Sequence, residues 1–340
     1  MSQSMIAIAA LLMTAGVAHA QRAPFSTIPA QSIFGNSYSI DIHRVGSDFS
    51  ASPGTGTRLE PEGMVFHDGT LYVSGDGTGS ETNGYLAAYA GGDVRFLPSA
   101  IGPFSSSNAL GTTARFGGEG ITVNTRGAGY GSFAGTTPNI VGVDNVIGGV
   151  GRQLAVQNLS TTTVQNQLNA FINADDLTFV PGTDASSDRF AILDGTAPIP
   201  VLSFFSAGAT PTALGSTFAL PLGAKGLLYL SAADAALFST LATGPAILVA
   251  SSPDGVQTTN RLTLFSLTGT QLENSSLPTG VGAGLFGNIE ALAFDSLTRR
   301  LFIGDETGAS SQIAVLTIPT PSIAALLGLA GLAAARRRRA

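Results

Sequence analysis

The sequence contains no cysteine, and only 11% of its 340 residues are charged. Without cysteine, no disulfide can hold the fold and no thiolate can act as a nucleophile or a metal ligand. Histidine is almost as scarce: beyond the N-terminal segment only His43 and His67 occur, too few for a three-histidine metal site. No Gly-x-Ser-x-Gly elbow is present either. The sequence therefore offers no complete catalytic constellation, and whether the chain is an enzyme stays open.

Basic residues are also few in the body of the chain. Residues 21–318 hold 12 basic and 22 acidic residues, and Lys225 is the only lysine in the protein. Nucleic-acid binding needs clustered lysine and arginine, so this balance excludes nucleic acid as a partner. Apolar residues make up 44% of the chain, which is enough for a core, and the 43 glycines are typical of an all-β protein with many tight turns.

A short pattern recurs through the body: a charged residue, then a small or acidic residue, then an apolar strand. The repeats begin 50 to 65 residues apart, and such near-regular self-similarity is the mark of a repeat architecture. The five segments are Glu62–Phe66, Glu119–Val123, Asp175–Phe179, Lys225–Tyr229 and Glu290–Phe294.

Each repeat continues into further short apolar segments, as expected for the four antiparallel strands of a propeller blade. The sequence predicts an all-β protein with one domain, residues 21–318, that folds as a five-bladed β-propeller. Six blades is the alternative, if the long fourth unit is divided; its residues 232–241 are alanine-rich and predict a short helical insertion. The last unit is one strand short, and the segment Ser37–His43 is predicted to complete it, because closure removes unpaired strand edges. Residues 21–35 are predicted to be a linker.

The two ends of the chain have the patterns of targeting segments. Residues 5–18 form an apolar run that ends in Ala18-His19-Ala20. This predicts that residues 1–20 are a secretory signal peptide, with a buried N-terminal helix as the alternative. Residues 319–340 hold Pro319-Thr320-Pro321, an apolar run and Arg336, Arg337, Arg338 and Arg339. The run of 15 residues from 321 to 335 would span about 22 Å as a helix, which makes it a short transmembrane segment with its arginines in the cytoplasm.

This C-terminal arrangement resembles the PEP-CTERM sorting signal, although Thr320 stands where the namesake of that family has glutamate. The resemblance implies that an exosortase-type membrane protease and signal peptidase process the protein. It also implies delivery to the outer surface or the extracellular matrix after transient anchoring in the membrane. An ordinary C-terminal anchor is the alternative, and it would export the body as well.

The first strand of each blade lines the central channel of a propeller, so the leading residues of the repeats are expected to meet at one end of it. These residues are Glu62, Glu119, Asp175, Lys225 and Glu290. Four carboxylates together favour Ca²⁺ or another hard cation as a ligand, while Lys225 would neutralise one acid or meet an anionic group. The alternative is structural, with each acid accepting backbone hydrogen bonds from the next blade. Asp76 and Asp305 follow second strands; they are secondary metal candidates, with turn capping as the alternative.

The repeats resemble those of β-propeller phytases and gluconolactonase-type propellers, which keep acidic metal ligands near their inner strands. Phytases also gather several lysine and arginine residues to bind phosphate, whereas this body has one lysine. The resemblance therefore does not extend to phosphomonoesterase activity. The expected function is therefore an exported, non-catalytic binding or structural propeller, with matrix polysaccharide as a candidate partner. The alternative is a Ca²⁺-dependent hydrolase of the phosphoesterase or lactonase type that acts at the channel.

If residues 319–340 are a sorting signal, the mature protein lacks them. Intact-mass measurement of the protein extracted from the cell surface is expected to show loss of residues at both ends. A mature form that retains Arg336–Arg339 would contradict exosortase-type processing.

Overall fold

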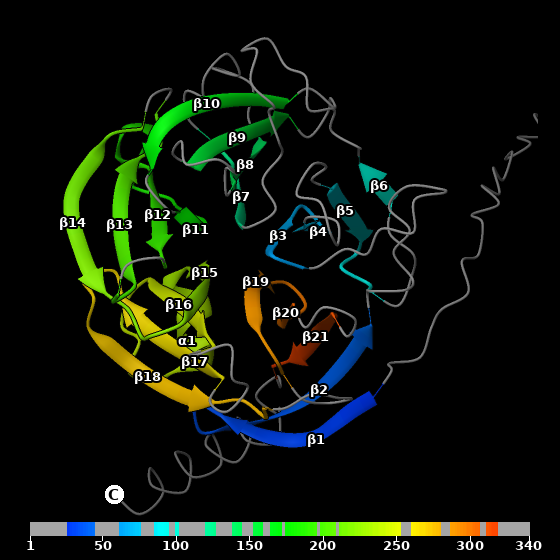
Figure 1. The fold of residues 1–340 in the computed structure, drawn as a ribbon. Coiled ribbons are helices and arrows are strands. Elements are labelled where there is room, and N and C mark those ends of the chain that lie inside the picture. Colours follow the sequence, from blue (N-terminus) through cyan, green and yellow to red (C-terminus); the bar gives the residue numbers. More distant parts are fainter. Residues whose placement is uncertain are drawn as a thin grey trace, which may run out of the picture.

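The computed structural model describes residues 26–44, 61–75, 85–94, 99–101, 120–126, 138–144, 152–158, 164–171, 174–195, 198–208, 211–252, 260–279, 286–306 and 311–318. These residues are almost entirely β-structure, in antiparallel sheets arranged in the manner of a β-propeller (Figure 1). Within these ranges no helix is long and apolar enough to cross a membrane. The predicted signal peptide, the predicted C-terminal helix and the arginine cluster all lie outside the described residues.

Four of the sheets have four strands each, in simple sequence order. The first contains β3 (Gly63–His67), β4 (Thr70–Gly75), β5 (Tyr85–Ala90) and β6 (Ser99–Ile101). The second contains β7 (Gly120–Asn124), β8 (Asn139–Asp144), β9 (Arg152–Asn158) and β10 (Val164–Phe171). The third contains β11 (Ala174–Val180), β12 (Arg189–Asp194), β13 (Val201–Ser206) and β14 (Ala213–Ala219). The fourth contains β15 (Ala224–Leu230), β16 (Ala246–Ser251), β17 (Arg261–Ser266) and β18 (Gln271–Ser276), and it is one sheet rather than two.

The remaining sheet joins the two ends of the described chain. Its strand order is β1 (Ser26–Ile33), β2 (Asn36–Arg44), β21 (Gln312–Thr317), β20 (Arg300–Asp305) and β19 (Ile289–Asp295). The antiparallel pairing of β2 with β21 confirms that the segment around Ser37–His43 completes the last unit. The linker prediction for residues 21–35 is wrong in part, because Ser26–Ile33 forms a further strand on β2. Burial explains the pairing, since Tyr38, Ile40 and Ile42 all lie in the main hydrophobic cluster.

One edge strand of each sheet lies on the inside: the first strand in each four-stranded sheet, and β19 in the five-stranded sheet. These inner strands contact one another in ring order: β3, β7, β11, β15, β19 and back to β3 (Figure 1). Equivalent positions lie side by side around the ring. A Cβ added at Gly63 would stand 2.8 Å from the backbone nitrogen of Ile121, and one at Gly226 would stand 2.9 Å from the carbonyl oxygen of Glu290. The small residue of the repeat is therefore required by backbone-to-backbone contact between neighbouring inner strands.

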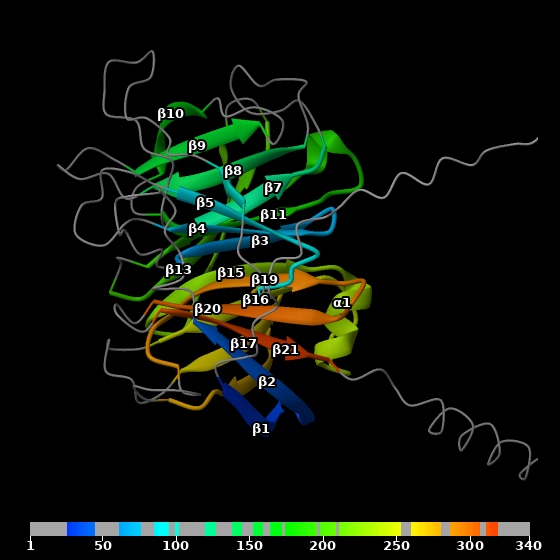
Figure 2. The same ribbon diagram turned by 90° about the vertical axis from the view of Figure 1, so that its right-hand side faces the viewer.

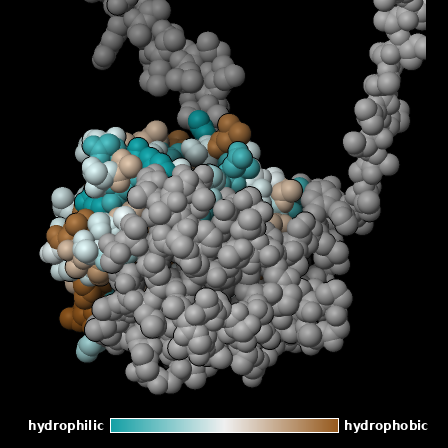
Figure 3. Space-filling model, turned by 90° about the horizontal axis from the view of Figure 1, so that it is seen from above, coloured by the Kyte–Doolittle hydropathy of each residue, from teal (hydrophilic) through white to brown (hydrophobic). Residues whose placement is uncertain are grey.

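Local sequence accounts for the turns and the helix between the strands. Asp68 and Gly69 both have positive φ, which is the geometry that a two-residue hairpin between β3 and β4 requires. The predicted helical insertion is α1 (Ala232–Phe238), which begins with Ser231 as its N-cap and buries Phe238. Figure 2 shows α1 at the edge of the molecule, at the end of the inner strands opposite to their starting residues. On the described part of the surface that Figure 3 shows, hydrophilic and hydrophobic residues lie next to one another.

A methyl group at Gly120 is expected to destabilise the fold. It would stand 2.6 Å from Cα of Asp176 in the next inner strand, and this backbone cannot rotate away as a flexible side chain could. The variant Gly120→Ala should lose about 1–3 kcal/mol of unfolding free energy in chemical denaturation. Gly244→Ala is the matched control, since no atom lies within 4 Å of its added Cβ, and its stability should change by less than about 0.5 kcal/mol. Equal stabilities of the two variants would contradict the close packing of the inner strands.

Candidate functional site

The inner strands all begin at the same end of their ring, which we call the axial mouth. Asp175 is the second residue of β11, Lys225 of β15 and Glu290 of β19, while Glu62 lies immediately before β3. Because equivalent positions of neighbouring inner strands are adjacent, these side chains start from one level of the ring. Glu119 and Asp76 lie outside the described residues. The leading residues that the structure describes are thus at one end of the ring, as the repeat predicts.

Lys225 and Glu290 face each other across neighbouring inner strands. Nζ of Lys225 lies 3.6 Å from Oε1 of Glu290, and the lysine side chain is 40% exposed whereas that of the glutamate is 13% exposed. The amide of Asn288 donates from Nδ2 to the same Oε1 at 2.7 Å and to Oε2 of Glu306 at 3.1 Å. Glu290 is therefore held by an amide and a cation, with a second carboxyl group close by.

Burial raises the pKa of Glu290 from its ordinary value to about 7, because the charged form loses its hydration. Lys225 opposes this rise by favouring the carboxylate, and Glu306 adds to it through its negative charge. A carboxyl group with a pKa near neutrality can both donate and accept a proton at physiological pH. The mouth therefore contains one group that is suited to acid–base chemistry.

Asp176 occupies the position at which the other inner strands have glycine or alanine. It is buried against the next strand. Its Oδ1 accepts a hydrogen bond from the backbone N–H of Leu177 at 2.7 Å, and its Oδ2 accepts one from the backbone N–H of Leu227 in β15. Burial raises the pKa of Asp176 well above its ordinary value; the two backbone bonds oppose the rise, and the charges of Asp175 and Glu290 add to it. Asp176 thus links the third and fourth sheets and lies within the electrostatic range of the mouth.

Asp305, at the end of β20, holds the loop that leads into β19. Its carboxylate accepts hydrogen bonds from the backbone N–H groups of Gly287 and Asn288 and from the side chain of Gln312, at 2.7 to 3.0 Å. These contacts are those of the capping alternative, and they fix the backbone from which Asn288 reaches Glu290. Within the described ranges, no group of three or more histidine, aspartate or glutamate side chains is arranged to hold a metal ion.

Sequence reasoning missed three residues of this site: Asp176, Asn288 and Glu306. Asp176 had a local signal, since it is the only acid at a position where the other repeats have glycine or alanine. Asn288 and Glu306 had none, because they flank β19 and β20 and meet only when these strands pair. Their contact with Glu290 is a product of the sheet register.

The fold and the mouth define the class: a β-propeller-like protein with a carboxyl-rich site at one end of its ring of inner strands. No family model and no curated protein sequence matches this chain. Solved structures share the arrangement at low identity. One GH43 β-1,3-galactosidase has a TM-score of 0.47 at 11% identity, with 78% of this chain and 91% of that chain covered. A second has a TM-score of 0.49 at 9% identity, with 81% and 60% covered.

A sialidase of Trypanosoma rangeli is similar as well, with a TM-score of 0.45 at 10% identity. The match covers 87% of this chain but only 55% of the sialidase, so this chain spans about half the length of that protein. Likeness at these identities concerns the fold, and it transfers no substrate to this chain.

The comparisons nevertheless correct the functional expectation from the sequence. The similar structures described above are glycosidases and sialidases, not phytases, lactonases or non-catalytic matrix proteins. These neighbours do not support the expected non-catalytic binding or structural role, nor the alternative of a Ca²⁺-dependent phosphoesterase or lactonase. The physical reason lies at the mouth, where the sequence could show a ring of acids but not that one of them is buried beside a lysine and a second carboxyl group.

The raised pKa of Glu290 predicts a pH dependence of stability. Between its ordinary value of 4.5 and about 7, the unfolded chain releases this proton while the folded chain keeps it, so stability falls as pH rises through this window. Glu290→Gln has no such proton, and its unfolding free energy relative to the parent should therefore rise by up to about 3 kcal/mol between pH 4.5 and 7. Urea denaturation of both proteins across this range measures the difference. A difference that does not change with pH would show that Glu290 titrates normally.

Proposed function

We propose that this protein is a glycoside hydrolase that acts at the axial mouth, with Glu290 as its general acid. The observation that carries the proposal is the setting of Glu290: mostly buried, hydrogen-bonded to Asn288 at 2.7 Å and 3.6 Å from Lys225. Glycoside hydrolysis needs a carboxylic acid that is protonated near neutrality to protonate the leaving oxygen, and a pKa of about 7 meets this need.

The second carboxyl group that such a reaction needs is assigned here to Asp175. It is the second residue of β11, on the same level of the ring, and it is 9% exposed. In this role its carboxylate assists an attacking water or attacks the anomeric carbon, while the proton of Glu290 goes to the departing oxygen. Glu306 is assigned a different role: it shares the amide of Asn288 with Glu290 and raises the pKa of the acid.

Lys225 sets the operating range of the acid in this proposal. Its positive charge lowers the pKa of Glu290, and without it the acid would hold its proton to a higher pH. The repeat places lysine at a position where the other four units have acids, which supports a specific role for this charge.

The overall organisation that accompanies this function is a propeller of five blades, in which the five-stranded sheet serves as the last blade and closes the ring through β2 and β21. Residues 1–20 are proposed to direct export, through signal peptidase, and residues 319–340 to be an exosortase-processed sorting signal. The protein would then work outside the cell or on its surface, where polysaccharide of the matrix is a substrate of suitable chemistry. Ca²⁺ has no assigned role in the mechanism.

Glu290→Gln is expected to lower kcat at least about 10²-fold on the glycoside that the parent cleaves best, because the leaving oxygen loses its proton donor. Asp175→Asn should lower it comparably. Lys225→Met should instead keep activity and move the alkaline limb of the pH–rate profile to higher pH. The substrate is first found by screening the parent on a panel of aryl glycosides and polysaccharides.

The matched control for these variants is Glu273→Gln. Glu273 is a glutamate on the outer strand β18, where it accepts a hydrogen bond from Ser239 at 2.9 Å. It should leave the kinetics unchanged. A parent that cleaves no glycoside of the panel, or a Glu290→Gln variant with unchanged kcat, would overturn the proposal.

A further inference from the structure

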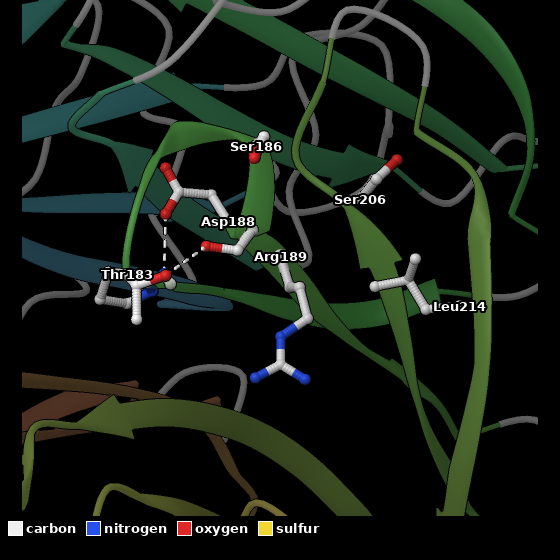
Figure 4. A pocket seen from close by; sticks show the side chains of 9 residues that line it. Thr183, Ser186, Asp188, Arg189, Ser206 and Leu214 are labelled. Atoms are coloured by element: carbon white, nitrogen blue, oxygen red, sulfur yellow. Dashed lines mark hydrogen bonds between the residues drawn. The ribbon is translucent and has the colours of Figure 1, made fainter.

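A cavity lies in the third sheet, at the end of the ring opposite to the axial mouth. β11 leaves the mouth at Asp175 and reaches the other end at Val180, where it pairs with Arg189 of β12. The cavity, of about 640 Å³, lies beyond this pairing (Figure 4). It is lined by the connection from β11 to β12 and by the near ends of β13 and β14: Pro181, Gly182, Thr183, Ser186, Ser187, Asp188, Arg189, Ser206 and Leu214.

The floor of this cavity is held rigidly by hydrogen bonds. The buried carboxylate of Asp188 accepts from the backbone N–H of Gly182 at 2.7 Å and from the guanidinium of Arg126 at 2.6 to 3.1 Å. The side chain of Asp184 caps the turn Ala185–Ser187 by accepting from the backbone N–H groups of Ser186 and Ser187. The lining residues are therefore positioned before any ligand arrives, which lowers the entropy cost of binding.

Asp188 and Arg189 are the charged residues among those that line the cavity. The negative charge of Asp188 is matched by Arg126, which comes from the second sheet. Arg189 stands over the ring of Phe204, with its guanidinium carbon 5.0 Å from the ring centre. The part of the chain that the structure describes gives Arg189 no carboxylate partner, and Figure 4 shows its guanidinium apart from the labelled acid. Its N–H groups thus remain as donors for an acidic ligand, in the flat forked geometry that suits a carboxylate.

The other walls define the rest of the ligand. Thr183, Ser186, Ser187 and Ser206 present hydroxyl oxygens. Ser186 and Ser187 donate their own protons to Asp184, Thr183 bonds to Ser187 and Ser206 bonds to Thr212, so these oxygens offer a ligand their remaining lone pairs as acceptors. Figure 4 shows the side chains of Ser206 and Leu214 on the other side of Arg189. Leu214 is 47% exposed and offers an apolar contact. A hydroxylated ring with one carboxylate group matches this combination: the carboxylate to Arg189, the hydroxyl groups to serine and threonine, and an apolar ring face to Leu214.

We propose that this cavity is a binding site for a sugar acid, separate from the axial mouth, with Arg189 as the residue that recognises the carboxylate. Because the cavity and the mouth lie at opposite ends of β11, the two sites can be occupied together. The site would let the protein hold an acidic saccharide without cleaving it, and it does not depend on the hydrolase function proposed for the mouth.

The test is calorimetric titration of the full chain with sodium glucuronate, at low ionic strength because the cavity is open to solvent. Glucose is the matched neutral probe, and inorganic phosphate is a second anion. Glucuronate is expected to bind, and glucose to bind at least tenfold more weakly. Absence of glucuronate binding, or equal binding of glucose, would overturn the proposal. Phosphate that binds through Arg189 more tightly than glucuronate would overturn the ligand class.

Two variants locate the binding. Arg189→Gln should weaken glucuronate binding at least tenfold, and Arg261→Gln, an exposed arginine of the fourth sheet, should leave it unchanged. Because Arg189→Gln also removes the contact with Phe204, Ser206→Asp serves as a second variant that keeps Arg189 and places a competing carboxylate beside it. Unchanged binding in either cavity variant, or loss of binding in Glu290→Gln, would place the ligand elsewhere and overturn the assignment.

Discussion

The structure depends on one constraint: five inner strands meet around an axis so closely that their backbones touch. A side chain at the contact would collide with the neighbouring strand, as the distances at Gly63, Gly120 and Gly226 show. The small residue is therefore a requirement of the ring, and the residue before it is the first one free to carry a functional group. The same geometry thus excludes large side chains from the second position of the repeat and leaves the first position free for a functional side chain.

Asp176 is the exception, because it places a large side chain where the other inner strands have a small residue. Its side chain fills the space that Gly120 leaves, lies 2.2 Å from where a Cβ of that glycine would be, and bonds to the backbone of the next inner strand. A buried acid of this kind resists ionisation, so the third sheet contributes one acid that is locked into the ring and one, Asp175, at the mouth. Glu290 lies between these extremes: it is buried enough to hold its proton and close enough to Lys225 to release it.

At the opposite end of the ring, arginines tie neighbouring sheets together. Arg126 of the second sheet bonds Asp188 of the third, and Arg300 of the last sheet bonds Asp295 and the carbonyl groups of Gly91 and Gly92 in the first. Each arginine satisfies a carboxylate and backbone carbonyl groups at once, which a shorter or more flexible cation would not do as well. The two ends thus differ: one gathers acids around a single lysine, and the other pairs its acids with arginine.

The sequence by itself determined the inner strands and the end of the ring at which their charged residues lie. The acid, small residue and apolar strand are local consequences of crowding at the axis, so Glu62, Asp175, Lys225 and Glu290 could be placed from the repeat alone. The closing strand around Ser37–His43 could also be predicted, because its alternating apolar residues need a covered face.

The outer strands and the chemistry of the site were decided by the tertiary structure. β14 and β18 are largely exposed, so they have no apolar alternation to reveal them, and pairing with the strand before them makes them strands. Glu290 becomes a weak acid only because Asn288, Glu306 and Lys225, from three different segments, surround it in a place with little water. Desolvation depends on what covers a residue, and no local pattern of the sequence encodes that cover.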